Sequence, residues 1–299
     1  MKYYKLKKGL SEIFLITTKE DFEEKTGNKR AFMYFGEDKN KRGLAICPAC
    51  DNPIRILGLY KKLENRSPYG QHHNKSTDFA TFDKNSYIHC PYSNPDTKNK
   101  DISNKERLPS EYEKQIYYIT RDYFDKIIYY LNKKINLRIS DNFATKRLND
   151  FIKYYGYMQY DASIYNIPWK ILDSSSPFNL INMSVKKDSE LWKKLKKLDS
   201  IILIENPIIK EYDIIKNKNS KYVNLQGHFI KHTRIIVDDE IEESITLAIT
   251  EDEEPPLNWI YKETYKVKLE EFNNFCNKTQ NKFRNEKQLK IAREIMKDI

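Results

Sequence analysis

The sequence predicts an α+β protein in two parts, an N-terminal β-rich unit over residues 1–97 and a mixed helical and antiparallel-sheet domain over residues 98–299. Three observations favour this class. Short apolar runs alternate with turn residues in the first part, two amphipathic helical patterns follow, and strand patterns separated by turns recur toward the end. A chain of 299 residues is typical of about two domains. The charged segment 94–107 is the predicted linker between them.

The N-terminal unit carries several short strand patterns around one short helix. We expect strands at 13–18, 31–35, 43–46 and 54–60, a helix at 19–25, and a loop over 64–81. The loop contains Pro68 and Gly70, which interrupt regular structure. This part therefore predicts a small sheet with little helical cover.

The second part begins with two strong helical patterns that should pack together. Ser110 and Glu113 form a capping-box pair, and apolar residues then recur at helical spacing as far as Lys134. A second helix should start at Asp141 or Asn142 and stop at Gly156. Further elements are an irregular segment at 157–178, a helix from about 188, strands at 201–205, 222–230, 233–237 and 244–250, and an amphipathic C-terminal helix from about 267 with at most one break.

Composition excludes several classes of protein. No run approaches the roughly 20 apolar residues of a membrane-spanning helix, and the first residues do not lead into a secretory signal core. We therefore expect a cytoplasmic protein with no membrane partner. The eight glycines lack the spacing of a dinucleotide fingerprint or a phosphate loop, so no nucleotide cofactor is expected.

The motif C-P-A-C at 47–50 is the strongest chemical feature of the sequence. It falls between two predicted strands, where a tight turn can aim both thiolates of Cys47 and Cys50 at one tetrahedral ion. A hairpin with this turn resembles the zinc knuckle of zinc ribbons, and the resemblance covers the hairpin only. It implies a zinc-ribbon-like character for the N-terminal β unit.

The other half of a metal site should come from Cys90, which precedes a proline as Cys47 does, and from one of His72, His73 and His89. His89 and Cys90 should point to opposite faces of a strand, which argues for His72 or His73. We favour His72, delivered by the turn at 68–70. The predicted set Cys47, Cys50, His72 and Cys90 fills all four positions of a structural Zn²⁺ site. A redox pair or buried free thiols are the alternatives, and Cys276 should lie in the core.

The excess of basic over acidic residues in the chain indicates a nucleic-acid partner. Lys+Arg total 53 against 43 Asp+Glu, giving a net charge of +10, although a composition rich in Lys, Asn, Ile and Tyr can also reflect coding bias. A helix from about 188 would present a basic ridge beside Trp192, whose indole could stack on a base or pack on the core. The predicted contact residues are Lys186, Lys187, Trp192, Lys193, Lys196 and Lys197.

Catalytic candidates are weaker, and the sequence favours a non-catalytic nucleic-acid-binding protein with a structural zinc. A nuclease is one alternative, using His228 and His232 for acid and base transfer, or the carboxylates at 238–243, Asp238 and Glu240 among them, to hold Mg²⁺. A protein-interaction adaptor is the other alternative. By analogy alone, a role in prokaryotic genome maintenance or defence is expected.

Overall fold

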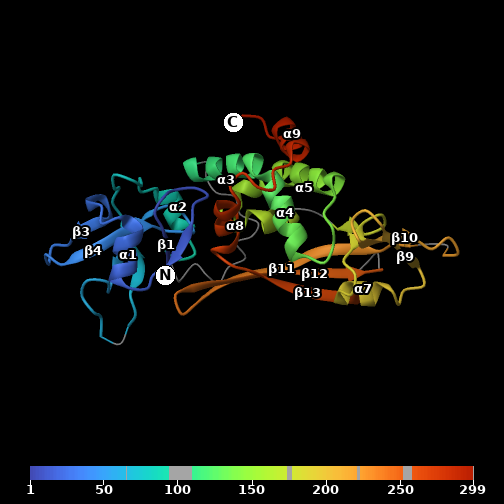
Figure 1. The fold of residues 1–299 in the computed structure, drawn as a ribbon, viewed down its shortest axis with the longest axis horizontal. Helices are drawn as coiled ribbons and strands as arrows, with labels where there is room; N and C mark the ends of the chain where they lie inside the picture. The colour runs from blue at the N-terminus through green and yellow to red at the C-terminus, as the bar shows by residue number, and fades with distance from the viewer. Residues whose placement is uncertain (65, 94–109, 174–176, 221–222, 252–257, 299) are drawn as a thin grey trace.

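The computed structural model describes residues 1–64, 66–93, 110–173, 177–220, 223–251 and 258–298. The predicted α+β class is confirmed, because helices combine with antiparallel sheets. The N-terminal unit lies at one end of an elongated molecule, and long strands run beneath a layer of helices toward the other end (Figure 1). The predicted linker at 94–107 lies outside the described residues.

The N-terminal sheet has the order β2-β1-β4-β5-β6, with β3 paired to β4. Its elements are β1 (Tyr3–Lys5), β2 (Ile13–Leu15), α1 (Lys19–Thr26), η1 (Arg30–Phe32), β3 (Met33–Phe35), β4 (Lys41–Ile46), β5 (Pro53–Leu57), β6 (Tyr69–His72) and α2 (Lys84–Ile88). Thr18 caps the start of α1, and Gly27 ends it at φ 60°, a conformation that glycine adopts without strain. β6 corrects the expectation of a loop over 64–81, because main-chain pairing with β5 compensates for its weak strand pattern.

The helical layer departs from the predicted boundaries. It contains α3 (Glu111–Asp122), α4 (Phe124–Lys134), α5 (Asp141–Lys153), η3 (Gly156–Met158), α6 (Ile167–Asp173), α8 (Glu271–Thr279) and α9 (Glu286–Ile295). The helix expected from Ser110 to Lys134 is two helices, since Tyr123 leaves the helical conformation at ψ 19°. The C-terminal helix has one break, which the sequence prediction allowed, at Gln280 with φ 29°. α6 lies in a segment that was expected to be irregular.

Two further sheets form the second part, with the orders β13-β12-β11-β7 and β8-β10-β9. Their strands are β7 (Phe178–Asn179), β8 (Ser184–Val185), β9 (Ile201–Asn206), β10 (Glu211–Lys216), β11 (Gln226–Val237), β12 (Glu240–Thr250) and β13 (Trp259–Val267), with α7 (Glu190–Leu195) before β9. The two strands expected at 222–230 and 233–237 are one strand, β11, interrupted by a register shift between Ile230 and Thr233. β10 and β13 were not predicted.

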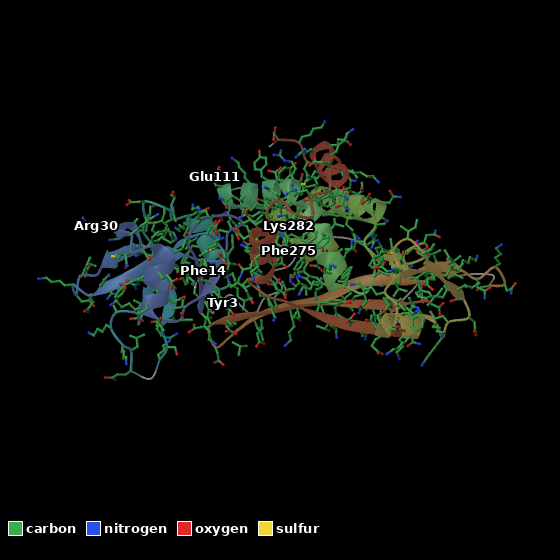
Figure 2. The ribbon with its side chains drawn as sticks, viewed as in Figure 1. Tyr3, Phe14, Arg30, Glu111, Phe275 and Lys282 are labelled. Carbon is green, nitrogen blue, oxygen red and sulfur yellow. The ribbon has the colours of Figure 1, made fainter. Side chains whose placement is uncertain are left out.

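Side-chain contacts join the two parts. The Asn274 amide on α8 accepts from Ile13 N (2.8 Å) and donates to Ile13 O (3.1 Å), so it covers the edge of β2. Tyr112 on α3 donates to Ala49 O at 2.6 Å and accepts from Ile164 N at 3.3 Å. Buried residues of both parts belong to one hydrophobic core, and side chains fill the space between the helical layer and the long strands (Figure 2). The boundary at 97/98 stays a prediction.

Within the described ranges, no helix is both long and apolar enough to cross a bilayer.

Candidate metal centre

The four predicted metal ligands converge. The donor atoms of Cys47, Cys50, His72 and Cys90 all lie within 4.8 Å of one another. Cys47 Sγ is 3.7 Å from Cys90 Sγ, and Cys50 Sγ is 3.3 Å from His72 Nε2. A tetrahedron with Zn–S bonds of about 2.3 Å has S···S edges of roughly 3.8 Å, so the arrangement matches that of a single tetrahedral ion.

Three elements bring these ligands together. Cys47 and Cys50 lie in the turn between β4 and β5, where the Cys47 amide donates to Asn52 O at 2.8 Å and Asp51 adopts φ 59°. His72 is the last residue of β6 and pairs with Ile54 of β5. The neighbouring strand therefore aligns the imidazole with the turn.

Asn52, which was not among the predicted site residues, connects the turn to the fourth ligand. Its Nδ2 donates to Cys50 Sγ at 3.4 Å, and its Oδ1 accepts from the Asp83 amide at 2.7 Å. Asp83 caps α2, which ends just before Cys90. The sequence gives no signal for this role, because only the fold shows that Asn52 is fully buried and therefore needs specific partners for its amide.

The electrostatics of the thiols favour a cation among them. Burial acts to raise the pKa of Cys47, but hydrogen bonds from Cys50 and Cys90 and from backbone amides lower that pKa well below its usual value. Burial and the neighbouring sulfurs raise the pKa of Cys90 well above its usual value. The opposite pKa shifts of Cys47 and Cys90 show that one thiolate disfavours the other, whereas a divalent cation would compensate for both charges.

The remaining histidines and cysteine lie elsewhere. The His73 ring contacts Tyr34 at 5.1 Å between centroids, and the His89 ring contacts Tyr160 at 4.1 Å. The expectation that His89 and Cys90 share a strand is wrong, because they follow α2. Cys276 is buried on α8, as expected, and burial raises its pKa to about 12.

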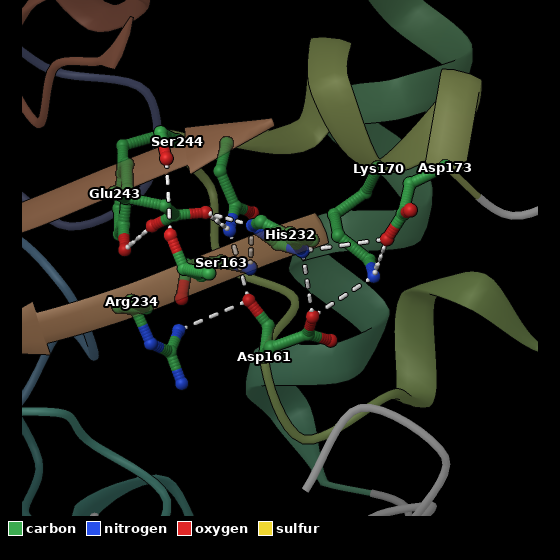
Figure 3. A network of polar contacts seen from close by, with 11 residues as sticks. Asp161, Ser163, Lys170, Asp173, His232, Arg234, Glu243 and Ser244 are labelled. Atoms are coloured by element: carbon green, nitrogen blue, oxygen red, sulfur yellow. Dashed lines mark hydrogen bonds and ion pairs between the residues drawn. The ribbon is translucent and has the colours of Figure 1, made fainter. Parts of the chain in front are cut away.

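A second cluster surrounds His232 on β11. His232 Nδ1 lies 3.0 Å from Asp161 Oδ2 and 3.3 Å from Asp173 Oδ2, and its Nε2 lies 2.6 Å from Glu243 Oε1 (Figure 3). Lys170 Nζ reaches the same oxygens of Asp161 and Asp173 at 3.0 and 2.9 Å. The imidazole of His232 on β11 therefore contacts side chains from three other elements, which are the loop that carries Asp161, helix α6 and strand β12.

This cluster is electrically balanced without a metal ion. A metal ion could be ligated by donor atoms of Asp161, Asp173 and His232, which lie close enough together. The charges nevertheless balance without an ion, because the cluster contains three carboxylates and three cations. The carboxylates are Asp161, Asp173 and Glu243, and the cations are Lys170, His232 and Arg234. Burial acts to lower the pKa of His232, but hydrogen bonds to the three carboxylates outweigh it and raise the pKa to about 11. The ring is therefore an imidazolium that holds the carboxylates, and we interpret the cluster as a structural ion network.

Of the other proposed catalytic residues, Glu243 contacts His232, whereas His228, Asp238 and Glu240 form no common site with it. The His228 ring packs edge-on against Trp259 at 5.2 Å. Asp238 and Asp239 form the tip of the β11–β12 hairpin at φ 48° and 65°. Arg66 binds Asp239, and Lys2 binds Glu240. The structure therefore distributes the carboxylates of 238–243 among separate partners.

The predicted basic ridge is present on and around α7, with one change. Lys187, Lys193, Lys196 and Lys197 are exposed, whereas Lys186 is half-buried and donates to Ile135 O at the end of α4. Trp192 is half-buried, with its ring packed edge-on against Tyr212 and the ammonium of Lys196 5.0 Å from its centroid. Stacking of this indole on a base stays a prediction.

Comparison of the chain with protein-family models, with curated proteins and with solved structures gave no match. The functional interpretation therefore depends on the geometry of the site.

Proposed function

We propose that the protein is a nucleic-acid-binding protein whose N-terminal sheet is held by a structural Zn²⁺. The observation that carries the zinc assignment is the convergence of Cys47, Cys50, His72 and Cys90 from two strand ends and one helix end. Three thiolates and one imidazole leave no coordination position for a substrate, which favours a structural role. The free thiols suit a reducing compartment, which supports a cytoplasmic location.

Elemental analysis of the purified protein tests the metal assignment. We expect one zinc per chain in the wild type and a marked loss in Cys50→Ser. Cys276→Ser is the matched control, because it removes an equally buried thiol away from the site. Equal zinc content in all three proteins would contradict the assignment.

Charge and surface chemistry support the nucleic-acid partner. The net charge is +10, and exposed lysines on and beside α7 lie next to the aromatic pair Trp192 and Tyr212. Lysines that neutralise phosphates release counterions, so affinity should fall steeply with salt. Titration of mixed-sequence DNA and RNA at several salt concentrations tests this proposal. Affinity that is weak and insensitive to salt would contradict it.

An adaptor function is the second candidate, supported by the β9–β10 hairpin. Ile204 is 53% exposed on β9, a strand at the edge of its sheet, and Ile208 is 88% exposed in the turn that follows. Exposed apolar side chains on a free edge are typical of protein-interaction sites. Ile204→Lys would abolish recruitment of a protein partner under this function and would leave nucleic-acid binding unchanged.

A further inference from the structure

A cavity of about 410 Å³ adjoins the candidate metal centre. Arg55, Tyr69, Gln71 and Tyr92 line it from the N-terminal unit, and Ile236 and Asp239 line it from the β11–β12 hairpin. Its volume lies within the range of sites that bind small ligands. The cavity therefore lies where the zinc-held sheet meets the second part of the chain.

Arg55 supplies a fixed positive charge to this cavity. Its Nε and Nη2 donate to Gln71 Oε1 at 3.0 and 2.7 Å, so a neutral amide orients the guanidinium without compensating its charge. Among the described residues, Arg55 takes part in no ion pair. An oriented guanidinium with free donors is well suited to bind a phosphate.

Aromatic rings supply the other half of the site. Tyr69, Tyr87 and Tyr92 all line the cavity. The Arg66 guanidinium lies 3.7 Å from the Tyr69 ring centroid and is itself bound to Asp239 at 2.6 Å, which fixes that ring. A ring held in this way offers its other face to a base with little loss of conformational entropy.

We propose that this cavity holds one nucleotide of a single-stranded nucleic acid, with a phosphate on Arg55 and the base against the tyrosines. The inference rests on the proposed nucleic-acid function and assigns it a site. A single strand is required because the bases of a duplex are stacked inside the helix and cannot enter a cavity of this size. The zinc would hold β6, which carries Tyr69 and Gln71, in register beside Arg55.

Fluorescence anisotropy with a labelled strand of about 12 nucleotides, a length within the usual range of single-strand site sizes, tests the proposal. We expect Arg55→Gln to weaken binding about tenfold and to reduce the salt slope by about 1. Arg30→Gln, which removes an exposed arginine on η1, should change affinity less than about twofold. Tyr69→Ala should weaken binding about tenfold, whereas Tyr154→Ala, at an exposed tyrosine after α5, should not.

The possible failures are distinguishable. If the wild type binds neither DNA nor RNA at low salt, the nucleic-acid function itself is wrong. If the wild type binds but Arg55→Gln behaves as Arg30→Gln does, the cavity assignment is wrong and the function stands. Duplex that binds as tightly as the single strand, with the same loss in Arg55→Gln, would overturn the single-strand assignment. Zinc content, measured in each variant, should equal that of the wild type and excludes loss of the fold as the cause.

Discussion

His232 Nε2 lies 2.6 Å from Oε1 of Glu243, a carboxylate that is 3% exposed. The same imidazolium contacts Asp173 of α6 through Nδ1 and so ties the helical layer to the long sheet. We predict that His232→Ala lowers the free energy of unfolding by about 3–5 kcal/mol, because it leaves a buried carboxylate without its cation. Urea denaturation measures this loss. His228→Ala, on the same strand, should cost only about 1 kcal/mol, the value of an edge-on ring contact.

The network also predicts how stability depends on pH. The raised pKa of His232, about 11, gives a contribution that is complete below the unfolded value of 6.5, declines above it and is lost once pH passes about 11. Burial acts to raise the pKa values of Asp161 and Glu243, but their bonds to His232 lower both, so their contribution is lost as pH falls below 4 to 5. Denaturation of the wild type and His232→Gln across pH measures the difference in stability, which should be largest between about pH 5 and 6.5 and should shrink on either side. A constant difference would contradict the interpretation.

Removal of the metal should loosen the N-terminal sheet selectively. The ion would join the 47–50 turn, the end of β6 and the end of α2, so a chelator removes the link among these three elements. We expect faster amide hydrogen exchange in β4, β5, β6 and α2, with a fall in local opening free energy of several kcal/mol. Leu247 and Ile249 on β12, fully buried in another sheet, should keep their protection. Uniform acceleration along the chain would contradict a local role.

Local sequence patterns predicted the elements that depend on local chemistry. The helix α1, the cap of α3 and the turn at 47–50 were identified because their signals lie within a few residues. β6 and β13 were missed, because their strand conformation depends on partners that pair with them from a distance. The break at Tyr123 was also missed, since the apolar period continues through it.

The metal ligands and the cluster around His232 also differ in how far the sequence could predict them. The metal ligands could be predicted because Cys-x-x-Cys and a lone later cysteine are rare and distinctive. Asp161 and Asp173 could not, because single carboxylates are common and their partner His232 lies more than fifty residues later. His232 itself was assigned to possible catalysis, since its strand pattern gives no indication of the three carboxylates that surround it. Burial of a charge, which only the fold reveals, decides its role.

The junction between the two parts yields a further prediction. Asn274 makes two hydrogen bonds with the backbone of Ile13, as a neighbouring strand would. Asn274→Ala should lower the free energy of unfolding by about 2–3 kcal/mol, because it leaves a donor and an acceptor at the edge of β2 without partners. Asn149→Ala, at an exposed asparagine on α5, should stay within about 0.5 kcal/mol of the wild type in the same urea denaturation. Equal stability of the two variants would show that the Asn274 bonds add no net stability to the docking of α8 on β2.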